Sequence, residues 1–77
     1  MSRTFQDENF LVWEAYPSAA KFGFSQDPFL VFQCITDRGL RPRSLQVTGD
    51  AADAERLVVR ASPAELLALL RQSKTVG

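Results

Sequence analysis

The sequence contains no histidine, and this absence removes more functional classes than any other feature of the chain. Without an imidazole there is no Ser-His or Cys-His nucleophile and no common general base near neutral pH. Cysteine occurs once, as Cys34, which excludes an internal disulfide and a thiolate metal site. We therefore expect no catalytic residues, no cofactor and no metal, and we predict that the protein is not an enzyme.

The chain also lacks an excess of charge of either sign, and it lacks a long apolar run. Nine Lys and Arg balance nine Asp and Glu, whereas proteins that follow a phosphate backbone usually carry a basic excess. Zero net charge gives little repulsion between copies, so we expect a monomer or a weak homodimer. Because no apolar run approaches 18 residues and no signal peptide is recognisable, we expect a cytoplasmic protein without membrane contact.

What the sequence does have is a high content of apolar side chains for a chain of 77 residues. Hydrophobic residues make up 45% of it, including six Phe, one Trp and one Tyr. A short chain buries a small fraction of its surface, and large aromatic side chains compensate for this. The length allows a single domain over residues 1–77.

The first half of the chain has the pattern of an antiparallel sheet. We predict a short strand over 3–6 and a longer one over 10–16, which Pro17 ends because proline donates no ladder hydrogen bond. Residues 29–36 are apolar on both faces, which is typical of a central strand. Residues 43–48 alternate between apolar and polar, as in a half-exposed strand near a sheet edge.

The second half has helical signals. Asp50 and Asp53 form a near capping box, and the apolar residues that follow them have helical spacing: Ala54, Leu57, Val58 and Ala61. A strand over 56–62 is the alternative, because Val58 and Val59 are β-branched. Ser62-Pro63-Ala64-Glu65 predicts the start of a second helix, after which the last residues are expected to fray. Strands followed by helices indicate an α+β fold: a small antiparallel sheet of three to four strands, followed by two short C-terminal helices packed on one face.

Cys34 and the arginines that follow it could form one site or two separate features. Cys34 shares a strand face with Leu30 and Phe32, so we interpret it as a core residue rather than a reactive thiol. Arg38, Arg41 and Arg43 lie in or beside a turn, where they are either solvated or recognise an anionic partner.

Residues 18–28 are the least regular segment, and we interpret them as a loop that contains the motif KFGF at 21–24. Together with FLVF at 29–32 this motif resembles the two ribonucleoprotein motifs of cold-shock OB-folds, over residues 13–35. The resemblance implies that Lys21, Phe22, Phe24 and Phe32 would stack on bases or contact phosphates. The chain lacks the histidine of the second motif and ends in helical signals where that family continues with strands.

We predict a small non-catalytic interaction or regulatory module that binds another protein, because aromatic and arginine side chains dominate binding hot spots. The alternative is a single-stranded nucleic-acid-binding domain that uses the KFGF and FLVF aromatics and the arginines. The candidate contact residues are Trp13, Tyr16, Phe22, Phe24, Arg38, Arg41 and Arg43.

Overall fold

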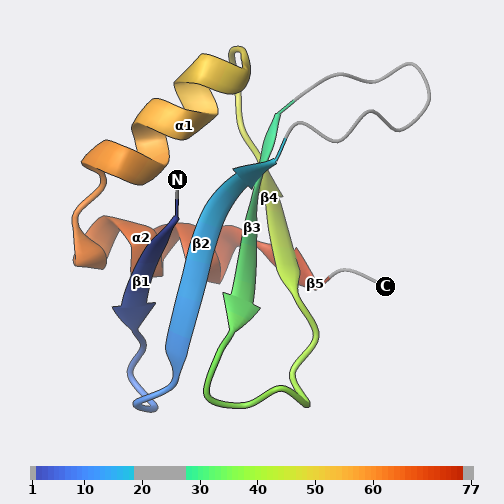
Figure 1. The fold of residues 1–77 in the computed structure, drawn as a ribbon, viewed down its shortest axis with the longest axis vertical. Helices are drawn as coiled ribbons and strands as arrows, with labels where there is room; N and C mark the ends of the chain where they lie inside the picture. Colours follow the sequence, from blue (N-terminus) through green and yellow to red (C-terminus); the bar gives the residue numbers. More distant parts are fainter. Residues whose placement is uncertain (1, 19–27, 76–77) are drawn as a thin grey trace.

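A five-stranded antiparallel sheet carries two helices on one of its faces (Figure 1). The computed structural model describes residues 2–18 and 28–75. The strands lie in the order β1-β2-β3-β4-β5, which is also their order along the chain. The elements are β1 (Arg3–Gln6), β2 (Val12–Ser18), β3 (Phe29–Cys34), β4 (Arg43–Gln46), α1 (Ala51–Arg60), α2 (Pro63–Gln72) and β5 (Lys74–Thr75). The predicted α+β class is confirmed, with one strand more than expected.

Strand β2 continues past the proline that was predicted to end it. Pro17 pairs with Leu30 and Ser18 pairs with Phe29 in the neighbouring strand β3. On the other side of β2, β1 begins only opposite Ala15, where Arg3 is its partner. The prediction was wrong at this point because proline is tolerated where one side of a strand has no neighbour that needs its N–H.

Strand β3 lies in the middle of the sheet, as its doubly apolar sequence predicts. It pairs with β2 on one side and with β4 on the other. Leu30 and Phe32 are fully buried on the face that the helices cover, while Phe29 and Val31 lie on the opposite face and are only half-buried. The second apolar face is therefore not covered by a helix.

Both helices begin at complete capping boxes, and this resolves the open choice between helix and strand at 56–62. Asp50 accepts a hydrogen bond from the amide of Asp53, whose carboxylate accepts one from the amide of Asp50. Ser62 and Glu65 repeat the arrangement at the start of α2, where Pro63 takes the first helical position. These hydrogen bonds satisfy amides that have no partner within the helix, so the sequence signal for each start is confirmed.

The capping bonds also lower the pKa of the carboxylate at the third helical position of each helix, Asp53 in α1 and Glu65 in α2. The backbone hydrogen bond from Asp50, followed by the hydrogen bond from Arg56, holds the pKa of Asp53 below its ordinary value of 3.8. The backbone and then the side chain of Ser62 lower the pKa of Glu65 from its ordinary value of 4.5. Hydrogen bonds to an ionised carboxylate favour its charged form.

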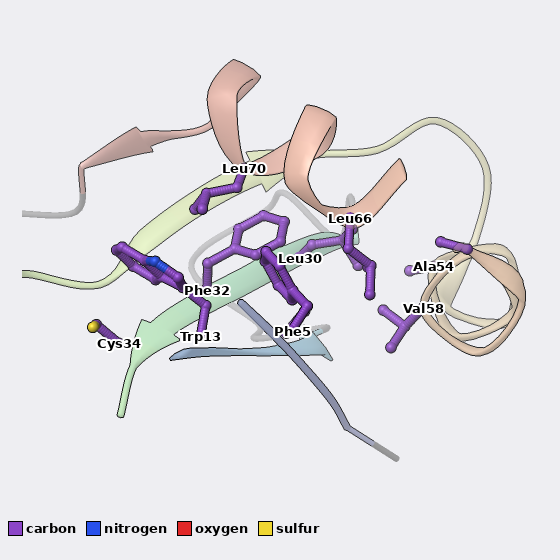
Figure 2. Packing of buried hydrophobic residues seen from close by; sticks show 11 residues of the cluster. Phe5, Trp13, Leu30, Phe32, Cys34, Ala54, Val58, Leu66 and Leu70 are labelled. Carbon is purple, nitrogen blue, oxygen red and sulfur yellow. The ribbon is translucent and has the colours of Figure 1, made fainter. Parts of the chain in front are cut away.

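The core lies between the helices and the sheet. Figure 2 shows Leu66 and Leu70 of α2 above Leu30 and Phe32 of β3, with Val58 and Ala54 of α1 to one side. The rings of Phe5 and Phe32 meet edge to face, with centroids 6.1 Å apart. Because such pairs add stability beyond the area that they bury, this contact fixes β1 against the centre of the sheet.

Two arginines attach the helices to the strands. The guanidinium of Arg3 donates to the carbonyls of Val58 and Val59 at the C-terminal end of α1, at 3.2 and 2.8 Å. Arg43 of β4 donates hydrogen bonds to Ser73, just beyond the end of α2. A cation at the C-terminal end of a helix complements the helix dipole and its unpaired carbonyls.

The last residues that the structure describes, Lys74 and Thr75, form a short strand, while the final two residues, for which fraying was also expected, lie outside the described residues. Lys74 pairs with Ser44 and Thr75 pairs with Arg43, which forms the fifth strand. Two residues have no measurable period, so this strand could not be found from the sequence pattern. Within the described residues, no helix has the length and apolar content needed to cross a membrane.

Candidate functional site

The β1–β2 turn and the β3–β4 loop lie at the same end of the sheet (Figure 1). Residues of both connections line a groove at this end. Its volume is about 730 Å³, which falls within the usual range for ligand sites. We call it the basic groove, because three arginines line it. The lining residues come from both loops, β2, β4, the last turn of α2 and β5: Asp7, Asn9, Leu11, Trp13, Gly39, Leu40, Arg41, Arg43, Leu70, Arg71 and Thr75.

Asp7 organises one wall of the basic groove. Its carboxylate accepts hydrogen bonds from the amides of Asn9 and Leu11, at 2.8 and 3.0 Å, and from the indole N–H of Trp13 at 2.8 Å. Partial burial acts to raise the pKa of Asp7, but the hydrogen bonds from Trp13, Leu11 and Asn9 together lower it below the ordinary 3.8. Asp7 therefore stays ionised and holds the turn and the indole in place.

The same turn exposes an aromatic side chain. Phe10 has φ 64°, in the left-handed region that bulky residues rarely adopt, and its side chain is 79% exposed. Such a backbone conformation costs about 1–3 kcal/mol and persists only when the surroundings enforce it. Here the amide of Phe10 donates a hydrogen bond to the carbonyl of Asp7, and the amide of Asp7 donates one to the carbonyl of Leu11. The turn thus holds Phe10 in the solvent.

The opposite wall is the β3–β4 loop, which separates two of the predicted arginines. The side-chain carboxylate of Asp37 accepts a hydrogen bond from the amide of Gly39, and the backbone carbonyl of Asp37 accepts one from the amide of Leu40. Arg41 lines the basic groove on the helix side of the sheet. Arg38 lines a second hollow that Glu14 of the helix-free face also lines. Neither arginine forms an ion pair with another described residue, so both present free charge, in different directions.

The third predicted arginine, Arg43, has a structural role. Its Nε donates to Ser73 Oγ at 2.8 Å, a second nitrogen donates to the Ser73 carbonyl, and a third lies 3.5 Å from Thr75 Oγ1. Ser73 is 5% exposed, and its hydroxyl also donates to the Leu70 carbonyl. Arg43 therefore fastens β4 to the chain beyond α2. All of its partners among the described residues are neutral oxygens, and no described acid forms an ion pair with it.

The predicted aromatic contact residues also differ in their burial and in the face of the sheet on which they lie. Trp13 is buried, with 6% of its surface exposed, so only a small part of its ring reaches the basic groove. Tyr16 is half-buried on the helix-free face, opposite Val31. Phe22, Phe24 and Lys21, with the loop predicted over 18–28, lie outside the described residues apart from Ser18 and Pro28.

Phe32 and Cys34 are both core residues. Phe32 has no exposed surface, so it cannot stack on a nucleic-acid base, and the role implied for it by the resemblance to cold-shock domains is wrong. Cys34 is 2% exposed, and its sulfur lies 3.6 Å from Thr36 Oγ1. The sequence interpretation of Cys34 as a core residue is confirmed. The basic groove does not include Cys34, although the hollow lined by Arg38 also reaches it.

Three residues at this end of the sheet were missed at the sequence level. Phe10 was assigned to a strand, although its position directly after Asp7-Glu8-Asn9 could have indicated an exposed turn residue. Leu40 is 40% exposed in the β3–β4 loop. Arg71 was not among the candidate residues, but it lines the basic groove and forms an ion pair with Glu8 of the β1–β2 turn.

No group of three or more acidic or cysteine side chains in residues 2–18 and 28–75 is arranged to hold a metal ion. Comparison of the chain with family models, with curated proteins and with solved structures finds no match.

Proposed function

We propose that the protein is a small non-catalytic module that binds another protein through the loop end of its sheet. The observation that carries the proposal is a concentration of exposed apolar side chains beside free arginines. Of the four large apolar side chains that are exposed among the described residues, three lie here: Phe10, Ile35 and Leu40. Arg38 and Arg41 lie in the same loop as Leu40.

This combination has the composition of a binding hot spot. Large apolar residues exposed singly are ordinary on a protein surface, whereas several gathered at one end, beside unpaired arginines, are typical of an interaction site. The rigid arrangement supports the same conclusion. Asp7 fixes the β1–β2 turn through three hydrogen bonds, and Asp37 fixes the β3–β4 loop, so a partner would not have to order these loops on binding.

The non-catalytic part of the proposal rests on the side chains that the site offers. Its polar groups are arginines and acids that already hold amides or cations, and the single thiol is buried. A binding function needs only shape, apolar area and charge, all of which the loop end provides.

A pull-down from a lysate of the native host tests the proposal with two single substitutions. Arg41→Glu reverses a charge in the basic groove, and Arg60→Glu reverses an exposed charge at the end of α1, outside the groove. A partner that wild type and the Arg60 variant recover, and that the Arg41 variant loses, supports the proposal. Arg43→Glu is unsuitable, because it would break the contacts to Ser73 and could unfold the chain.

Two results would contradict this function. Equal recovery of every partner by wild type and the Arg41 variant would exclude the basic groove as the binding site. Fluorescence polarisation of labelled single-stranded DNA and RNA at low salt addresses the other functional class. Binding that weakens steeply with added salt, and that Arg41→Glu abolishes, would replace the protein-binding proposal with a nucleic-acid one.

A further inference from the structure

The floor of the basic groove is apolar, and part of it can accept a side chain from outside. Leu11 and Leu40 line it from the two loops, and the core residues Trp13 and Leu70 line it as well. Trp13 and Leu70 are buried, with 6% and 7% exposed surface, whereas Leu11 is half-buried and Leu40 is 40% exposed. The apolar area still open to a ligand therefore belongs mainly to the two leucines of the loops.

The charge of the groove is positive, and one guanidinium is free. Arg71 is paired with Glu8, and the Asp7 carboxylate is occupied by its three donors. Arg43 bonds only to neutral oxygens, so its charge adds to the field in the groove without giving up its structural contacts. Arg41 lines the groove and has no partner among the described residues.

We propose that the basic groove binds a short acidic segment of a partner polypeptide. A carboxylate of that segment pairs with Arg41, and a large apolar side chain next to it packs on Leu11 and Leu40. This inference rests on the proposed protein-binding function and specifies the chemistry of the partner. A guanidinium matches a carboxylate with two parallel hydrogen bonds, and the field of Arg43 favours any anion placed there.

The same geometry disfavours the other anionic ligands. A dianionic phosphate group is best held by more than one free guanidinium, and here Arg43 and Arg71 already hold partners. A nucleic-acid base needs an exposed ring on which to stack, and the aromatic ring that lines the groove, the indole of Trp13, is almost completely buried, while the exposed Phe10 is not among the lining residues. One free cation beside two leucines matches one carboxylate beside one apolar side chain.

The experiment begins with selection of a random heptapeptide phage library on the immobilised wild-type chain. We expect a consensus with Asp or Glu within one or two positions of Leu, Ile, Phe or Met. The consensus peptide is then synthesised and titrated against the protein. Trp13 is the only tryptophan of the chain and lines the groove, so its emission reports occupancy of this site directly.

Three matched changes test the assignment of contacts. Arg41→Gln should weaken peptide binding by about fivefold or more, whereas Arg60→Gln should leave it unchanged. Replacing the acidic peptide residue with its amide should weaken binding to wild type but hardly to the Arg41→Gln protein. A phosphoserine version of the peptide should bind no more tightly than the carboxylate version.

The inference is overturned if the library yields a basic or purely apolar consensus, if Arg41→Gln and Arg60→Gln bind the peptide equally, or if phosphoserine increases affinity. These outcomes differ from failure of the proposed function. If the host partner depends on Arg41 while no acidic peptide binds, the module binds protein by another chemistry. If neither partner nor peptide depends on Arg41, both proposals fail.

Discussion

Replacing Arg43 with methionine should destabilise the protein far more than the same change at Arg41, two positions earlier in the chain. Methionine keeps an aliphatic stem but removes the guanidinium. At position 43 the change breaks the bonds to Ser73 Oγ and to the Ser73 carbonyl, together with the longer contact to Thr75. At position 41 no bond to another described residue is lost.

The magnitude follows from the number of bonds and their exposure. A hydrogen bond from a charged donor contributes about 1.5–3 kcal/mol, so two bonds to Ser73 give an upper value of about 3–6 kcal/mol. Arg43 is only half-buried, and water can replace part of what is lost, so we expect about 2 kcal/mol at position 43. For a chain of 77 residues this shifts the midpoint of thermal unfolding by about 8–16 °C, while Arg41→Met should change stability by no more than about 0.5 kcal/mol.

Urea unfolding followed by Trp13 emission and far-UV circular dichroism measures both variants. The reasoning predicts a lower midpoint at an unchanged slope for Arg43→Met, and a midpoint close to wild type for Arg41→Met. A double-mutant cycle with Ser73→Ala should give a coupling of about 1 kcal/mol between positions 43 and 73. Equal midpoints for the two arginine variants, or zero coupling, would refute the role assigned to Arg43.

Three further predictions test other parts of the structure. Stability should be constant between about pH 5.5 and 7.5, because the chain has no histidine, and should decrease below about pH 4. Asp7, Asp53 and Glu65 have lowered pKa values when folded, so their contribution to stability is complete above their ordinary pKa values and is lost on acidification. A urea midpoint that rises on acidification would contradict this. Gly49→Ala should lower the free energy of unfolding by more than about 1 kcal/mol, because φ at Gly49 is +102° and a Cβ there would lie 2.2 Å from Asp53 Oδ2. Gly39→Ala is the control and should have a clearly smaller effect, because the nearest atom to its Cβ would lie at 3.2 Å. Equal unfolding midpoints for the two variants would show that Gly49 is not constrained. Cys34 should react with iodoacetamide only as fast as the protein opens, so its labelling rate should rise with urea, and native-state labelling at the rate of a free thiol would disprove burial.

The sequence predicts those parts of the fold that depend on local chemistry. The two capping boxes lie within four-residue segments, and the doubly apolar segment at 29–36 marked the central strand. The predicted end of β2 was wrong because the tolerance for Pro17 depends on how far β1 extends along the neighbouring side. Strand β5 was missed because it is defined by its pairing with Arg43 and Ser44 and has no pattern of its own.

The site was less predictable, because exposure depends on how the strands are placed. Arg38, Arg41 and Arg43 look equivalent in sequence, yet one lies towards the helix-free face, one lines the groove and one is used to hold Ser73. Trp13 could be assigned to a face by alternation, but its hydrogen bond to Asp7 depends on the shape of the turn between them. Contacts between loops that are far apart in sequence leave no periodic signal.

The short outer strands of the sheet have a consequence for solubility. As described, the sheet ends in β1, with four residues, and in β5, with two, and these strands carry Arg3 and Lys74. A second copy that paired with β1 or β5 could form only very few main-chain hydrogen bonds there and would have to approach Arg3 or Lys74. These two short strands therefore oppose the association between sheets that a net charge of zero does not prevent.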